Sequence, residues 1–247
     1  MARENPLWGE ERIADELLLK LGSQISPRTM RKYMPKAPSA GPRGDQRWGT
    51  FLKNHAGAIL AGDFFVAVTV TFRVFYVFVV LEHGSRRILH CNATQHPTSE
   101  WTQQQLREAV SANHDYRFLI HDRSGIFSRE FGATAENMGL RVIKTPYRSP
   151  RANSICARTI GTVRRECLDH VIPLTEKHLR RILGEWVAHY NRGRPHSALG
   201  PGILDPPDGI PARLHLDRYR ITDGWKVASN PVLGGLHHEY GLIPRAA

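Results

Sequence analysis

Residues 58–63 read Ala-Ile-Leu-Ala-Gly-Asp, an apolar run that ends in the carboxylate of Asp63. The same arrangement returns at residues 118–122, Phe-Leu-Ile-His-Asp, where the run ends in Asp122. Short apolar runs of this kind are typical of strands in a protein core. The two runs therefore predict two core strands, each of which carries an aspartate.

The order of the predicted elements indicates the fold class. Strands are expected near residues 57–66, 72–82, 86–94, 116–121 and 140–145. Helices are expected at residues 98–110, 128–138, 152–168 and 175–191. Three strands followed by alternating helices and strands predict an α/β fold, with a mixed five-stranded sheet flanked by helices.

The two aspartates carry more information as a pair than singly. One aspartate at a strand end is usually a turn former or a helix cap. In a sheet of this order the strands of Asp63 and Asp122 can be neighbours, so their carboxylates can converge on one edge. Two converging carboxylates repel each other unless a cation lies between them. A pair of Mg²⁺ ions would satisfy both and act on a phosphodiester from two sides.

The charge of the chain points to a polyanionic partner. Its 247 residues carry a net charge of +11, and the isoelectric point is near 10. A basic surface without a partner is the alternative, but a solvated surface usually mixes the two signs. Residues 137–165 contain no acidic residue and seven basic ones. This stretch therefore favours contact with the phosphates of a nucleic acid.

Other features indicate a cytoplasmic protein with no membrane association. The longest apolar run, Val74 to Leu81, has the length of a strand and is too short to cross a bilayer. The first residues lack the layout of a signal peptide. Three cysteines without metal-ligand spacing are typical of reduced thiols.

Four segments are expected along the chain. Residues 1–35 predict two helices, the second opened by Ser26-Pro27, which fit either a helix-turn-helix or an ordinary helical hairpin. Such a pair needs a third element to bury its apolar face, and the chain begins too abruptly to supply one upstream. Residues 36–50 are a linker by composition, residues 51–200 the core, and residues 201–247 a C-terminal extension. Strand-like sets at 224–227 and 231–235 predict a small β-structure in that extension.

Several short motifs, in a fixed order, resemble one known family. They are Asp63-Phe64-Phe65, Phe118 to Arg123, the Ser149-Pro150…Asn153 turn, Gly161 to Cys167, and Trp186…His189-Tyr190-Asn191…Arg194-Pro195-His196. Over about residues 45–205 the chain resembles the integrase core of bacterial insertion-sequence transposases. These are DDE enzymes with a ribonuclease-H-like fold, akin to retroviral integrases. The segment from Asn5 to Tyr33 also resembles the helix-turn-helix that precedes the core in these transposases.

The resemblance implies a function in DNA integration, recombination and transposition. Family members nick double-stranded DNA at the element ends and join the 3′ ends to target DNA, with Mg²⁺ or Mn²⁺ as cofactor. They generally act as multimers, which implies a homo-oligomer. A bacterial, nucleoid-associated location in the cytoplasm follows from the same resemblance. Asp63 and Asp122 take the places of two catalytic metal ligands.

The third catalytic position departs from the family pattern. The family places a glutamate four residues after the asparagine of the Ser-Pro-x-x-Asn turn, whereas this chain has Ala157, which follows Asp122 by 35 residues. Glu166, nine residues further on, would lie on the opposite helix face and roughly 13 Å along the axis. We therefore predict weakened metal binding and a catalytically dead or strongly impaired protein whose fold and DNA binding survive. Either engineering or natural decay of the gene could account for the alanine.

Basic residues are expected to contact DNA, with a solvated basic surface as the alternative for each. They are Arg28, Arg31 and Lys32 on the second helix, and Lys144, Arg148, Arg151, Arg158, Arg164 and Arg165 before and along the helix of Ala157. Asn153 is expected to cap that helix, with a contact to DNA as the alternative. His121 is expected to be structural, because strand alternation turns it away from Asp122, and His237-His238 are expected at the surface.

Two rival functions remain open beside the transposase core. One is a non-catalytic DNA-binding protein that retains the recombinase scaffold. The other is a ribonuclease-H-like nuclease without strand transfer, against which the helix-turn-helix and the basic helix argue, since both suggest recognition of duplex ends.

Overall fold

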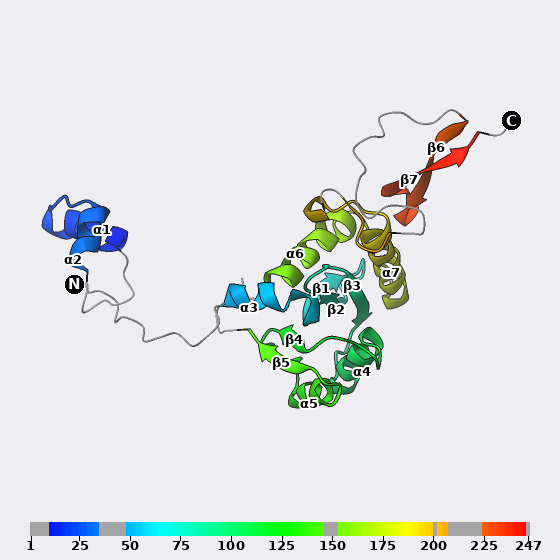
Figure 1. Ribbon diagram of the computed structural model, residues 1–247, viewed down its shortest axis with the longest axis horizontal. Coiled ribbons are helices and arrows are strands. Elements are labelled where there is room, and N and C mark those ends of the chain that lie inside the picture. Colours follow the sequence, from blue (N-terminus) through cyan, green and yellow to red (C-terminus); the bar gives the residue numbers. More distant parts are fainter. Residues whose placement is uncertain (1–9, 35–47, 146–152, 200–201, 207–223, 246–247) are drawn as a thin grey trace. The chain divides into compact units, whose positions relative to one another are not determined.

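The computed structural model describes residues 10–34, 48–145, 153–199, 202–206 and 224–245. The chain divides into two compact units, Met1–Arg47 and Trp48–Ala247 (Figure 1). Among the described residues no helix combines the length and the apolar character that a membrane crossing requires.

The first unit contains two helices, α1 (Glu10–Leu21) and α2 (Pro27–Tyr33), as predicted. The hydroxyl oxygen of Ser26 accepts a hydrogen bond from the backbone N–H of Thr29 at 3.2 Å and so caps α2. An ion pair between Glu10 and Arg31 joins the two helices. Only Ile13 and Ala14 of α1 are buried, and the apolar Leu18, Leu19 and Leu21 are exposed within this unit.

The second unit is built on a mixed five-stranded sheet, which confirms the predicted fold class. The strands are β1 (Ile59–Val68), β2 (Val74–Glu82), β3 (Ile88–Thr94), β4 (Phe118–His121) and β5 (Arg141–Lys144). Their order across the sheet is β3-β2-β1-β4-β5. β1 pairs with β2 and β2 with β3 in antiparallel fashion, whereas β4 runs parallel to both β1 and β5.

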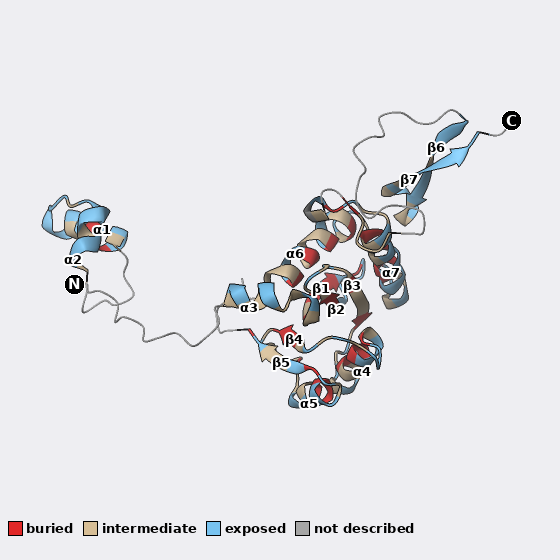
Figure 2. Cartoon of the chain, in the orientation of Figure 1, coloured by how far each residue is buried: buried red, intermediate tan, exposed pale blue. Residues whose placement is uncertain are grey.

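Helices cover both faces of the sheet, so its central strands are buried on both sides (Figure 2). One face packs against α4 (Ser99–Ala109) and α5 (Arg129–Asn137). The other packs against α6 (Ser154–Val163), a π-helical turn at Arg164–Leu168 and α7 (Glu176–Arg192). Alternation along β2 sends Val77 and Val79 to the α7 side and Phe78 to the α4 side. The side chains of Thr98, Ser128 and Thr175 cap α4, α5 and α7.

A further helix, α3 (Trp48–Asn54), lies across the predicted boundary between linker and core. The ring of Phe51 meets that of Phe118 edge to face, with centroids 5.0 Å apart. This packing places α3 beside the start of β4. The helix escaped sequence analysis because it is a short segment next to a run rich in Pro and Gly.

The C-terminal extension forms a two-stranded antiparallel sheet, β6 (Trp225–Val232) and β7 (His237–Pro244). The predicted β-structure is present, but the expected strand at 231–235 is wrong. Leu233, Gly234 and Gly235 all have positive φ, between 53° and 96°, and form the turn between the strands. Most residues of both strands are exposed, so neither shows the one-sided apolar alternation of a core strand.

Trp186 tests the packing of α7 on the sheet. Its side chain is 1% exposed and its ring lies 4.9 Å from that of Tyr190. Trp186→Ala should lower the free energy of unfolding by about 3–5 kcal/mol, because it leaves a large cavity. Urea denaturation followed by circular dichroism measures this loss. Trp225→Ala is the matched control: Trp225 is 41% exposed, so an equal loss there would contradict the assigned core.

Candidate active site and basic surface

The two aspartates meet on neighbouring parallel strands, which confirms the predicted adjacency of those strands. Ala61 of β1 is paired with Ile120 of β4. Asp63 lies two residues further along β1, Asp122 directly follows the end of β4 at His121, and the two carboxylates lie close enough for their charges to interact. Alternation along β1 directs the Asp63 carboxylate to the sheet face covered by α6, since Ala61 on that face packs against Cys156 of α6.

Burial and proximity both act on the charge of Asp63. Burial, first, and the neighbouring charge of Asp122 raise the pKa of Asp63 from 3.8 to about 6. The backbone N–H of Phe64 opposes this shift by donating to Oδ1 of Asp63 at 2.8 Å. Oδ1 of Asp122 accepts from the backbone N–H of Ser124 at 3.0 Å in the turn after β4. The site therefore disfavours two negative charges in the absence of a cation.

Helix α6 begins beside Asp63. Nδ2 of Asn153 donates to the carbonyl oxygen of Gly62 at 3.2 Å and approaches Oδ2 of Asp63 at 3.5 Å. The expectation that Asn153 caps α6 is therefore wrong, because its side chain makes no capping hydrogen bond and turns to β1 instead. Cys156 is buried, and the pKa of its thiol is raised by burial and then by the charge of Asp63.

Ala157 is exposed on α6, four residues after Asn153. Helical residues four apart share a face, so Ala157 stands one turn beyond the side chain that reaches Asp63. Its role as the position of a missing ligand stays a prediction. Glu166, the nearest acid downstream, is held by Arg194, whose Nε and Nη2 donate to its two oxygens at 2.8 and 2.7 Å.

The donor set at this site suits a hard divalent cation only in part. Among the described residues, no group of three or more His, Cys, Asp or Glu could hold a metal ion. Two carboxylates remain, and their oxygens are the ligands that Mg²⁺ prefers, with water or substrate phosphates completing its shell. A cation bound here would offset the two effects that raise the pKa of Asp63, which are burial and then the charge of Asp122.

The predicted basic residues occupy different situations. Lys144 is exposed on β5, and Arg158 and Arg165 are exposed on α6 and the π-helical turn, as are Arg28 and Lys32 on α2. Two others are engaged within the chain: Arg31 pairs with Glu10, and Nη2 of Arg164 donates to the carbonyl oxygen of Val66 at 3.1 Å. Arg148 and Arg151 lie outside the described residues.

The structure confirms the predictions for two histidines and corrects the prediction for a third. His121 is 1% exposed and lies 4.3 Å from the ring of Phe127, which confirms its structural role on the face opposite the aspartates. Burial is the first cause that lowers the pKa of His121. His237 is half-buried and not freely exposed, because its ring stacks on that of His189 of α7 at 4.9 Å. His238 is exposed, as predicted.

Two residues near the site escaped sequence analysis in their present roles. Asn153 contacts a partner 90 positions away, which no local capping rule can anticipate. Arg86 lies in the turn between β2 and β3 and faces the same region as Arg158. The doubled arginine at residues 86 and 87, at the start of the strand predicted near residues 86–94, was the available signal.

Comparison with known proteins finds one family model that is similar to part of this region. A family model for the integrase core domain matches residues 138–201, which include Ala157 and Arg158 but neither aspartate. No curated protein matches the chain.

Comparison with solved structures supports the fold. A chain in the cryo-EM structure of the simian T-cell lymphotropic virus intasome in complex with PP2A regulatory subunit B56 gamma aligns with a TM-score of 0.51. Its identity is 14%, over 98% of this chain and 87% of that chain. The Mos1 mariner transposase catalytic domain aligns with a TM-score of 0.46 at 16% identity. The alignment covers 57% of this chain and 77% of that chain. The BIV integrase catalytic core domain aligns with a TM-score of 0.43 at 10% identity. The alignment covers 60% of this chain and 91% of that chain. The first match establishes similarity of fold alone, and the other two scores are too low to add to it. The sheet and its flanking helices thus have the ribonuclease-H-like arrangement of integrase cores.

Asp63→Asn tests the electrostatics of the carboxylate pair. Because folding raises the pKa of Asp63, its stabilising contribution is full below about 3.8 and is lost as pH rises through about 6. Without metal, the variant should therefore match the wild type near pH 4 and exceed its stability by about 3 kcal/mol at pH 7.5, at ~1.36 kcal/mol per pKa unit. Urea denaturation in EDTA at both pH values measures this difference. Asp169→Asn, at an exposed aspartate, is the control, and a pH-independent difference for Asp63→Asn would contradict the burial of its charge.

Proposed function

We propose that this chain is the integrase-type catalytic core of a DNA recombinase, a transposase of a bacterial insertion sequence. The observation that carries the proposal is the parallel pairing of β1 with β4, which brings Asp63 of β1 near Asp122, the residue after β4. The integrase-core match over residues 138–201 supports it, because that segment supplies α6 and the position of Ala157. The intact family reaction is nicking of DNA at the element end and transfer of the freed 3′ hydroxyl to target DNA.

Asp63 and Asp122 would hold the Mg²⁺ or Mn²⁺ of this reaction. When bound, such a cation activates the attacking oxygen and stabilises the leaving oxygen of an in-line displacement. The contribution of the chain is to hold the two carboxylates near each other. Asn153 steadies this arrangement, since its amide links the start of α6 to Gly62 and Asp63.

Ala157 makes this copy inactive or strongly impaired. An alanine supplies no ligand oxygen, and Glu166 is committed to Arg194. Alanine also has the best helix propensity, so α6 does not depend on the missing acid. Metal affinity should fall while the fold and the DNA-binding surface remain.

Double-stranded DNA, both element end and target, is the proposed partner. The net charge of +11 and the acid-free stretch 137–165 support binding to phosphates. Residues 1–35 would act as a helix-turn-helix, residues 36–50 as a linker, residues 51–200 as the catalytic core and residues 201–247 as an extension. Action as a homo-oligomer on cytoplasmic, nucleoid-associated DNA belongs to the same proposal.

A non-catalytic DNA-binding protein is the second candidate. Ala157 is the observation that favours it, because a protein that only occupies element ends has no need of a third carboxylate. The two candidates differ in whether restoring one carboxylate restores chemistry.

Ala157→Glu separates these candidates. If the chain is a recombinase core that lacks one ligand, the variant should nick and join an end-bearing duplex with Mn²⁺ at least ~100-fold faster, which corresponds to about 2.7 kcal/mol of transition-state stabilisation. Gel analysis of labelled DNA measures both steps. Ala157→Gln is the matched control, since glutamine has the same size as glutamate but carries no charge.

The outcomes of this assay are distinct. Activity in Ala157→Glu that Asp63→Asn abolishes in the same background supports the recombinase core. An inert Ala157→Glu that still binds the duplex supports the non-catalytic protein. Full activity in the unaltered chain would show that position 157 is not a ligand position.

A further inference from the structure

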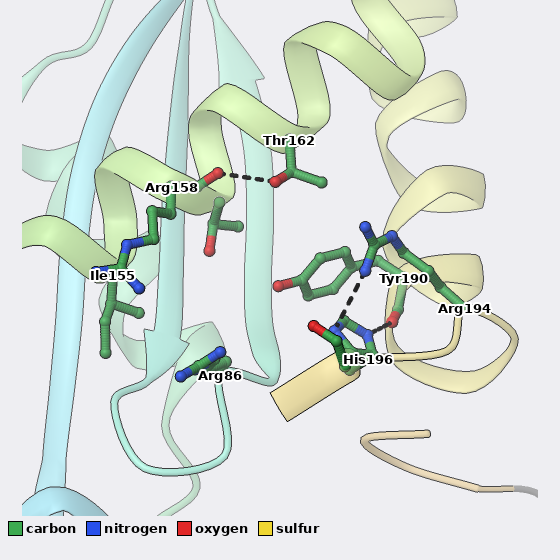
Figure 3. Close-up of a pocket in the computed structure, with 9 residues that line it drawn as sticks. Arg86, Ile155, Arg158, Thr162, Tyr190, Arg194 and His196 are labelled. Atoms are coloured by element: carbon green, nitrogen blue, oxygen red, sulfur yellow. Dashed lines mark hydrogen bonds between the residues drawn. The ribbon is translucent and has the colours of Figure 1, made fainter. Parts of the chain in front are cut away.

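A second site lies on the side of α6 that faces the turn between β2 and β3 and the segment after α7 (Figure 3). This pocket has a volume of about 150 Å³, well above the ~15 Å³ that a single water needs. Its lining includes the side chains of Arg86, Arg158, Arg194, Thr159, Tyr190 and His196. The pocket is lined by Arg158 and Thr159 of α6, whereas Cys156 of the same helix packs against β1 near Asp63.

The pocket holds more positive than negative charge. Arg86 and Arg158 are exposed, and neither has a carboxylate partner within the part of the chain that the structure describes. Arg194 is balanced by Glu166. Two arginines without a carboxylate partner thus line the cavity, and a guanidinium group donates in the planar, forked geometry that suits a phosphate.

The wall behind these arginines is ordered by its own contacts. The guanidinium of Arg194 lies 5.8 Å from the ring centre of Tyr190, and that ring meets His196 edge to face at 4.7 Å. Nε2 of His196 bonds the carbonyl oxygen of Tyr190 at 2.8 Å. Thr162 donates from its hydroxyl to the carbonyl oxygen of Arg158 at 2.9 Å, as Figure 3 shows. This wall is therefore formed before any ligand arrives.

Arg86 has an unusual backbone conformation. Its φ of 71° lies in the left-handed region, which an arginine rarely adopts. The backbone N–H of Arg86 donates to the carbonyl oxygen of Glu82 at 2.9 Å, which closes the turn. Such conformations persist where the surrounding structure imposes them, and they are frequent at binding sites.

We infer that this pocket seats one phosphate group of a bound DNA strand, held jointly by Arg86 and Arg158. The assignment of the phosphate to DNA rests on the proposed function, whereas the phosphate chemistry rests on the pocket itself. The two arginines come from elements far apart in sequence and converge on one cavity. They should therefore act on the same phosphate and not as two independent surface charges.

The salt dependence of duplex binding tests this inference. Fluorescence anisotropy gives the slope of log K against log salt for the full chain, and its magnitude falls by ~0.9 for each DNA phosphate that the protein no longer neutralises. Arg86→Gln and Arg158→Gln should each reduce the slope by ~0.9, and the double variant by the same ~0.9, because one phosphate is released in every case. Arg107→Gln, at an exposed arginine on α4, is the matched control and should leave the slope unchanged.

Inorganic phosphate provides the second measurement. It should raise the Tm of the wild type by about 2 °C over chloride at equal ionic strength, and should not stabilise either pocket variant. A double variant whose slope falls by ~1.8, or pocket variants that behave like Arg107→Gln, would overturn the shared site. The wild type could fail to bind duplex while phosphate still stabilises it through the pocket. That result would contradict the proposed function and support a site for a smaller phosphate ligand. Absence of both effects removes the site as well.

Discussion

The parallel pairing of β1 with β4 is the constraint on which the rest of this structure depends. β1 is the middle strand of the sheet, with an antiparallel neighbour on one side and a parallel one on the other. Side chains alternate along it, so a shift of one residue would turn every side chain to the other face. Leu60 and Ala61 are completely buried on opposite faces, which holds the register in place. Asp63 is delivered beside Asp122 because the apolar residues before it can pack in only one register.

This arrangement brings two like charges together at an energetic cost. Asp63 is half-buried, and both desolvation and Asp122 disfavour its ionised form. A cation at that point would reduce the repulsion between the two carboxylates. The pocket of Arg86 and Arg158 has the opposite imbalance, on an adjacent face of the same helix. Helix α6 thus stands between a site that favours a cation and a site that favours an anion, which is the division that a phosphodiester and its metal would require.

Local patterns were sufficient for the elements whose signal is local. The five core strands and the helices that flank them are bounded by apolar runs, turn residues and capping hydroxyls such as Thr98, so each was predictable within about two residues. β7 was not predictable from the sequence. Its exposed residues form no apolar face, and it is a strand because it pairs with β6. The interpretation of Asn153 as a cap failed for a related reason, because its actual partners, Gly62 and Asp63, are near in space and distant in sequence.

The sequence by itself determined the α/β fold class and singled out the two aspartates as candidate site residues. It also determined the alanine at position 157 and the surplus of positive charge. These follow from residue type and spacing along the chain. Only the tertiary structure decided that Asp63 lies near Asp122, that Glu166 is bound to Arg194, and that Arg86 lines the same cavity as Arg158. Each of these depends on which distant segments pack together, and that choice is made by the burial of the whole apolar surface at once.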